Sequence, residues 1–213
     1  IDSSNPPGNE TEVARYLQSL FEQAGVNGEI IEPEKGRGSF LVPIGSGPKK
    51  LLYFSHSDVV PVGEGWDFEP FSGEVKNGII HGRGALDCKD LLAAQVAAAL
   101  QLLEEKAELK GELIIAAVAD EETGGSLGAG YLAENYPEKL KADFAINEGA
   151  DHPIVYEDKM IYFIQIGEKG TAWSTITAHG AAGHGSVPTL ADNAVVKMTK
   201  AVSRLYNYRP EIE

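Results

Sequence analysis

Three short apolar runs that alternate with helical segments constrain the fold of this chain more than any other feature. The runs lie at residues 51–54, 113–119 and 144–146, and their continuous apolar character is typical of strands buried on both faces. A segment rich in Leu and Ala at residues 89–105 predicts a buried helix between the first two runs. Because strands that alternate with helices build mostly parallel sheets, we expect an α/β fold with helices on both faces of a central sheet.

Shorter signals predict the remaining elements of this part of the chain. Apolar residues three and four positions apart indicate a helix at residues 10–24, with Asn9 as its cap and Glu12 at the capping-box position. The dipeptide Asn77-Gly78 is typical of a tight hairpin. The other elements that we expect are strands at residues 29–31, 39–44, 73–75 and 79–81 and a helix at residues 126–135.

The sequence changes character near residue 168. An alternating pattern at residues 171–178 predicts a strand, a Gly-rich stretch follows at residues 179–188, and a helix is expected at residues 190–205. We therefore place a domain boundary between residues 168 and 169. The ends of the chain indicate part of a longer protein, because Ile1 is not an initiator methionine and no packed element follows the last helix.

The charge balance argues against a nucleic-acid partner. The chain of 213 residues has 18 Lys and Arg against 32 Asp and Glu, a formal net charge of −14, whereas binding to phosphates needs clustered cations. No apolar run reaches the roughly 18 residues of a membrane helix, so no membrane association is expected. The single cysteine, Cys88, fits a reducing compartment. We therefore expect a cytoplasmic protein.

Residues that bind metals or move protons follow each of the three apolar runs. His56 and Asp58 come after the first run, Glu121 and Glu122 after the second, and Glu148 after the third. Ligands of open parallel sheets bind beyond the carboxyl ends of the strands, so these side chains are expected to converge. Taken singly, a His-x-Asp pair is more often a surface hydrogen bond and a Glu-Glu pair a solvated face. Their joint occurrence at strand ends favours a functional site.

The expected site is a metal centre. Asp87 lies in a Gly-rich loop just before the helix at residues 89–105, where it can point at the same crevice. Clustered carboxylates repel one another unless a cation neutralises them, and mixed His and carboxylate ligands suit Zn²⁺ first, with Mn²⁺ or Co²⁺ as alternatives. Two ions would need one bridging carboxylate, for which Asp87 is the natural choice, and would activate a water for attack on a carbonyl.

Four segments in register carry a family resemblance. They are Ser-His-Ser-Asp-Val-Val-Pro at residues 55–61, Gly-Arg-Gly-Ala-Leu-Asp-Cys-Lys at 82–89, Asp-Glu-Glu-Thr-Gly-Gly at 120–125 and Gly-His-Gly-Ser-Val-Pro at 183–188. In order and spacing they resemble the co-catalytic zinc family that includes acetylornithine deacetylase, succinyl-diaminopimelate desuccinylase, aminoacylase and glutamate carboxypeptidase. The resemblance covers essentially the whole chain. It implies a zinc-binding catalytic domain at residues 1–168 and the start of a smaller α+β lid or dimerisation domain at residues 169–213.

The resemblance also implies a ligand set. His56 and Glu148 would hold one Zn²⁺, Glu122 would hold the other, and Asp87 would bridge the two, with the peptide bond after Asp87 in cis. The family's last ligand, a histidine far downstream, is missing from this chain, as is its substrate-binding arginine. We read Cys88 as a packed small hydrophobic residue rather than as a ligand.

Three further residues receive roles from the resemblance. Asp58 would accept a hydrogen bond from the imidazole of His56, and Glu121 would be the general base. His184 would stabilise the oxyanion across a dimer interface; the alternative is a histidine hydrogen-bonded within a Gly-rich turn. The remaining histidines match no ligand position and are read as structural: His81, His152 and His179.

These roles imply a metal-dependent hydrolase that cleaves the amide bond of N-acyl amino acids. The alternatives are a carboxypeptidase or dipeptidase of the same family, and a non-catalytic metal-binding homologue that forms dimers. The expected partners are a small N-acyl amino acid or peptide substrate and a second copy of the chain, joined through the lid domain. Because one ligand is missing, we expect this chain alone to be inactive or weakly active.

Overall fold

The computed structural model describes residues 1–149, 153–165, 170 and 174–210. The chain divides into two compact units, Ile1–Phe163 and Ile164–Glu213. The domain boundary expected between residues 168 and 169 lies outside the described residues. Each unit is considered separately below.

The first unit is built around a five-stranded sheet in the order β1-β2-β6-β3-β7. β6 pairs in parallel with β3, β3 pairs in parallel with β7, and β2 is antiparallel to both of its neighbours, so four of the five strands run in one direction. This arrangement confirms the mostly parallel α/β fold. The strands are β1 (Glu29–Ile31), β2 (Ser39–Gly45), β3 (Lys50–His56), β6 (Glu112–Val118) and β7 (Phe144–Ile146).

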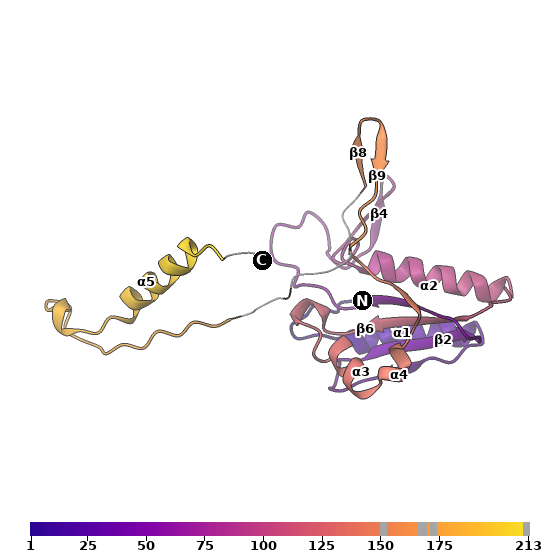
Figure 1. Ribbon diagram of the computed structural model, residues 1–213, viewed down its shortest axis with the longest axis horizontal. Helices are drawn as coiled ribbons and strands as arrows, with labels where there is room; N and C mark the ends of the chain where they lie inside the picture. The colour runs from indigo at the N-terminus through magenta and orange to yellow at the C-terminus, as the bar shows by residue number, and fades with distance from the viewer. Residues whose placement is uncertain (150–152, 166–169, 171–173, 211–213) are drawn as a thin grey trace. The chain divides into compact units, whose positions relative to one another are not determined.

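Helices cover both faces of this sheet (Figure 1). Apolar side chains of α1 (Glu10–Gln23) and α2 (Lys89–Glu104) pack with Phe40, Val42 and Ile115 on one face. α3 (Ala129–Asn135) and the short α4 (Pro137–Leu140) cover the opposite face, where Leu132 packs on Ile114, Ala116 and Val118. The continuous apolar run of β6 is thereby explained, because its residues face a helical layer on either side.

The register of the parallel strands brings their carboxyl ends together. His56, the last residue of β3, lies opposite Val118, the last residue of β6. β7 is paired with β3 on the other side and ends two residues before Glu148. The loops that leave these three strands therefore start from one edge of the sheet.

Several local predictions are wrong at the ends of elements. The helix expected at residues 126–135 begins only at Ala129, because Ser126 Oγ and the Leu127 N–H bond the carboxylate of Asp120 instead. Asn9 makes no side-chain capping bond to α1, and Glu12 pairs with Arg15. β7 is exposed at all three residues, since helices pack on the central strands rather than on this end of the sheet.

Two hairpins project from the sheet (Figure 1). The Asn77-Gly78 turn joins β4 (Glu74–Lys76) to β5 (Ile79–His81), and both turn residues have positive φ, as a tight hairpin requires. A second hairpin, β8 (Ile154–Tyr156) and β9 (Lys159–Ile161), is absent from the sequence predictions. Its turn residues Glu157 and Asp158 also have positive φ but lack the Asn-Gly signature.

The second unit contains a single turn of 3₁₀ helix, η2 (Pro188–Leu190), and the helix α5 (Ala194–Asn207) among its described residues. α5 begins later than predicted because the Asn193 side chain accepts from the N–H groups of Val195 and Val196 and so sets the start of the helix. The strand expected at residues 171–178 does not form over its described part, residues 174–178. No helix in the described ranges has both the length and the apolar character needed to cross a lipid bilayer.

The packing of β6 leads to a stability prediction. Ile115 is fully buried, so Ile115→Ala removes apolar contacts on the α1/α2 face and leaves a cavity. We expect the free energy of unfolding to fall by about 2–5 kcal/mol in urea titrations. Ile80→Ala is the matched control, because Ile80 is 63% exposed in the β4–β5 hairpin. Equal losses in the two variants would contradict this description of the core.

Candidate metal centre

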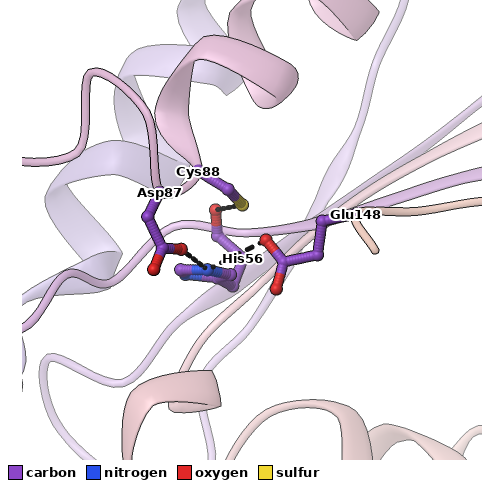
Figure 2. A group of neighbouring side chains, drawn as sticks. All are labelled: His56, Asp87, Cys88 and Glu148. Atoms are coloured by element: carbon purple, nitrogen blue, oxygen red, sulfur yellow. Dashed lines mark hydrogen bonds and ion pairs between the residues drawn. The ribbon is translucent and has the colours of Figure 1, made fainter. Parts of the chain in front are cut away.

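Three of the predicted ligand residues meet at the carboxyl edge of the sheet (Figure 2). His56 Nε2 lies 3.0 Å from Asp87 Oδ1 and 3.3 Å from Glu148 Oε2. His56 ends β3, Asp87 lies in the loop before α2, and Glu148 follows β7. The parallel register therefore assembles the group from segments that are up to 92 residues apart, 148 − 56.

The imidazole of His56 is almost completely buried and its orientation is fixed. Nδ1 lies 3.0 Å from the backbone oxygen of Asp58 and 3.4 Å from Asp58 Oδ1. Both neighbours are acceptors, so Nδ1 carries a hydrogen and Nε2 is the nitrogen that faces Asp87 and Glu148. Burial disfavours the imidazolium, but the bonds with Asp58 and Cys88 and the charges of Cys88 and Glu148 outweigh it and raise the pKa of His56 to about 12. His56 Nε2 faces two carboxylates, a negative environment that a proton or a divalent metal ion would neutralise.

The donor set fits such an ion. An imidazole nitrogen and carboxylate oxygens are ligands that Zn²⁺, Mn²⁺ and Co²⁺ accept in proteins. One ligand atom from each of His56, Asp87, Cys88 and Glu148 lies within 4.8 Å of all the others. Cys88 follows Asp87 through a cis peptide bond, as the resemblance implies, and its buried Sγ is 3.6 Å from the backbone oxygen of His56.

The Glu121-Glu122 pair is held beside this group by Asp58. Asp58 is fully buried, and its Oδ1 and Oδ2 accept the backbone N–H groups of Glu121 and Glu122, each at 3.1 Å. Glu121 Oε2 reaches within 3.9 Å of His56 Nε2, and burial together with the charge of Glu148 raises the pKa of Glu121. The two glutamates diverge, because Glu122 Oε1 accepts the N–H of Val60 at 3.1 Å. Glu122 thus lies outside the four-residue group.

A buried polar network behind Asp58 is absent from the sequence predictions. Asn5 Nδ2 donates to Asp58 Oδ2 at 2.8 Å, to Thr123 Oγ1 at 3.0 Å and to Asp120 Oδ1 at 3.3 Å. Asp120 also accepts from Arg37 at 2.7 Å. The Asn-Pro-Pro sequence and Arg37 were available signals, but the partners named here are 53 to 118 positions away in the chain.

The predicted residue His184 belongs to the second unit. Its Nδ1 lies 2.7 Å from Ser186 Oγ, and the side chain is exposed. Among the other histidines, His81 contacts the Phe68 ring edge-on, with the ring centroids 4.9 Å apart. The prediction for His152 lies outside the described residues.

The sheet is mostly parallel, and an imidazole and several carboxylates meet at one of its edges. These features are typical of an α/β protein with a metal-binding site at the ends of its strands. The family model described as "Peptidase family M20/M25/M40" matches residues 52–213, and the chain belongs to this family. The resemblance seen in the sequence is thereby confirmed.

Relatives and solved structures agree with this assignment. The chain is 33% identical over 196 residues to a succinyl-diaminopimelate desuccinylase of Wolbachia pipientis wMel, covering 90% of this chain and 48% of the relative. It is 33% identical over 199 residues to a probable succinyl-diaminopimelate desuccinylase of Staphylococcus aureus (strain MRSA252), covering 92% and 46%. The chain thus spans about half the length of the curated relatives that it matches.

The crystal structure of an M20 family metallo-carboxypeptidase from Sulfolobus solfataricus is also similar. Its TM-score is 0.63 at 34% identity, and the match covers 71% of this chain and 35% of that one.

The Asn5 contacts generate a prediction for stability. Asn5→Ala removes three hydrogen bonds and leaves Asp58 and Asp120 with fewer donors in a buried environment. We expect the free energy of unfolding to fall by about 1–3 kcal/mol in urea titrations. The control is Asn9→Ala, because the Asn9 side chain makes only an exposed bond of 3.4 Å to the Asp2 carbonyl. A loss no larger than the control's would show that the network contributes little.

Asp120 generates a prediction for acid stability. Burial disfavours its charge, but bonds from Thr123, Leu127 and Asn5 and the charge of Arg37 lower the pKa of Asp120 overall. A carboxylate with a folded-state pKa below its unfolded value of about 3.9 stabilises the fold above that pH and loses this contribution as the pH falls through the folded-state value. We therefore expect the gap in unfolding free energy between wild type and Asp120→Asn to shrink below about pH 4.

Asp67→Asn, which changes an exposed carboxylate, is the control for this pH series. A gap between wild type and Asp120→Asn that stays constant from neutral pH to the acid limb would contradict the prediction.

Proposed function

We propose that this chain carries the metal-binding part of a hydrolase that cleaves the amide bond of N-acyl amino acids. The observation that carries the proposal is the convergence of His56, Asp87 and Glu148 within hydrogen-bond distance at one sheet edge, with Glu121 beside them. The matched relatives are about twice as long as this chain, so their named activity is extended to it only within this proposal.

We assign His56 and Glu148 to one Zn²⁺, Asp87 to a bridging position and Glu122 to a second Zn²⁺; Co²⁺ and Mn²⁺ also fit these donors. Bound metal ions would polarise the amide carbonyl and lower the pKa of a water molecule. Glu122 would exchange its bond to the Val60 N–H for a metal, a change confined to one side chain.

The protein groups would divide the proton chemistry between them. Asp58 holds the Nδ1–H of His56, so that Nε2 stays an acceptor toward the metal site. Glu121 would take a proton from the attacking water and then donate it to the leaving amine. The position of Glu121 Oε2, 3.9 Å from His56 Nε2 and so beside the proposed ligands, supports this role.

Other parts of the proposal concern the whole protein. We assign residues 1–168 to the catalytic domain, residues 169–213 to the lid, and His184 to stabilisation of the oxyanion across a homodimer. We also place the protein in the cytoplasm. The domain and His184 assignments rest on the sequence resemblance, and the cytoplasmic location rests on the single cysteine.

The substrate class follows from the names of the relatives. Two of them are a desuccinylase and a probable desuccinylase, which favours an N-succinyl or similar N-acyl amino acid. The similarity to a metallo-carboxypeptidase supports cleavage of a peptide bond as the second candidate. A non-catalytic binding role is disfavoured, because a binding protein has no need of a base beside the metal ligands, and Glu121 lies there.

Metal content tests the core of the proposal. After incubation with Zn²⁺ and removal of excess metal, elemental mass spectrometry of the 213-residue chain should find one or two ions per chain. His56→Ala and Asp87→Ala should lose them, whereas His179→Ala, a change in the second unit, should not. Wild-type protein that retains no metal would contradict the proposed site.

Glu121→Gln separates catalysis from binding. We expect metal content to stay at the wild-type level while hydrolysis falls by about 10²–10⁴-fold, because the proton acceptor is lost. Release of succinate or acetate from N-acyl amino acids is followed by mass spectrometry over long incubations, with dipeptides run in parallel. Hydrolysis by the Gln variant at the wild-type rate would exclude Glu121 as the base. A metal-loaded full-length protein that is inert on every substrate would favour the binding role.

A further inference from the structure

The three proposed ligands come from segments whose spacing is set by more than the pairing of the strands. His56 ends β3, Asp87 lies in the loop before α2, and Glu148 follows β7 (Figure 2). The ladder between β3 and β7 has three residue pairs, of which the last joins Tyr53 to Ile146. This ladder therefore ends three residues before His56 and two residues before Glu148, so it does not reach the site itself.

The side chain of Gln95, on α2, connects the two strands beyond the end of this ladder. Its Oε1 accepts the hydroxyl hydrogen of Ser55 at 2.9 Å, and its Nε2 donates to the backbone oxygen of Ile146 at 3.4 Å. The carbonyl of Ile146 can only accept, so the amide turns Nε2 toward β7 and Oε1 toward β3. Ser55 directly precedes His56, and Ile146 lies two residues before Glu148. One side chain thus bonds to both strands next to their ligand residues.

The burial of Gln95 indicates what its amide contributes. Gln95 is 5% exposed and lies on the face of α2 that also buries Leu92, Val96 and Ala99. A polar amide in such surroundings is costly unless its hydrogen bonds are made, and an apolar side chain of similar size can replace it at little cost to stability. What an apolar residue cannot supply at this position is a bond to each strand.

We propose that Gln95 is a positioning residue that holds Glu148 at its distance from His56 in the metal site. The inference rests on the proposed function and adds a residue that acts through β7 rather than on the ion. β3 is held independently, since its pairing with β6 continues through His56. β7 is exposed at all three residues, so the bond to Ile146 restrains the segment that leads to Glu148. Without this bond the ion would lose a ligand that is already in place.

Competition titrations with a chromophoric Zn²⁺ chelator measure this effect on the 213-residue chain. Gln95→Met keeps a side chain of similar size and removes both hydrogen bonds. We expect its Zn²⁺ affinity to fall by about tenfold, the lower end of the range of roughly 10–100-fold that loss of an outer-shell partner costs. Ser55→Ala cuts only the β3 end of the link, and we expect a smaller loss of affinity in the same direction.

Val96→Ala is the matched control. Val96 is the next residue of α2, is 4% exposed and packs in the apolar core, so its truncation weakens the fold without removing either bond of Gln95. We expect the Zn²⁺ affinity of this variant to change by less than about threefold. In urea titrations of the metal-free proteins, Val96→Ala should lower the unfolding midpoint more than Gln95→Met does. Far-UV circular dichroism of each variant verifies that the fold is kept.

A double-mutant cycle with Glu148 tests the path of the effect. Glu148→Ala removes the ligand that Gln95 holds in the proposal and leaves His56 and Asp87, which we expect to bind Zn²⁺ more weakly. In this background Gln95→Met should lower the affinity by less than about twofold, because the side chain that it positions no longer takes part. A general disturbance of the fold would lower the affinity by the same factor in both backgrounds.

The outcomes separate this inference from the proposed function. A Zn²⁺ affinity of Gln95→Met within about threefold of the wild type, or equal losses with and without Glu148, would overturn the positioning role and leave the metal site standing. A wild-type chain that binds no Zn²⁺ would overturn both.

Discussion

The buried carboxylate of Asp58 is the interaction on which the rest of the site depends. Its two oxygens accept the consecutive backbone N–H groups of Glu121 and Glu122, while the same residue fixes the Nδ1 side of His56. Burial alone would raise the pKa of Asp58, but its bonds with His56, Asn5 and Glu122 lower it overall, so the charge is kept. One side chain thereby ties the end of β3 to the loop after β6.

The central strands and the candidate ligand residues that follow them could be predicted from the sequence. Apolar continuity identified β3 and β6, and the rule that ligands gather at the carboxyl ends of parallel strands predicted the meeting of His56 with Glu148. Prediction from the sequence failed where a structural feature depends on residues that are far apart in the chain. Asn5 and Arg37 meet Asp120 only in the folded chain. The late start of α3 likewise depends on bonds to Asp120 that compete with helix formation.

The reading of Cys88 illustrates the same limit in another way. From the sequence, a lone cysteine before a helix is predicted to pack as a small apolar residue. The burial of Cys88 agrees with this prediction. The cis peptide bond joins Cys88 to Asp87 at the site, and only the three-dimensional arrangement shows its sulfur near three other ligand atoms.

The pairing of β7 would couple metal binding at the proposed site to local folding. β7 contacts β3 over three residue pairs, and its own side chains are exposed, so few apolar contacts hold the segment that delivers Glu148. An ion bound to both Glu148 and His56 would act as a cross-link between these strands. Ligand binding stabilises the bound state by about 2.7 kcal/mol at a hundredfold excess over Kd. Slower amide hydrogen exchange in β7 would then measure occupancy of the site, so that the strand itself reports on the supply of metal.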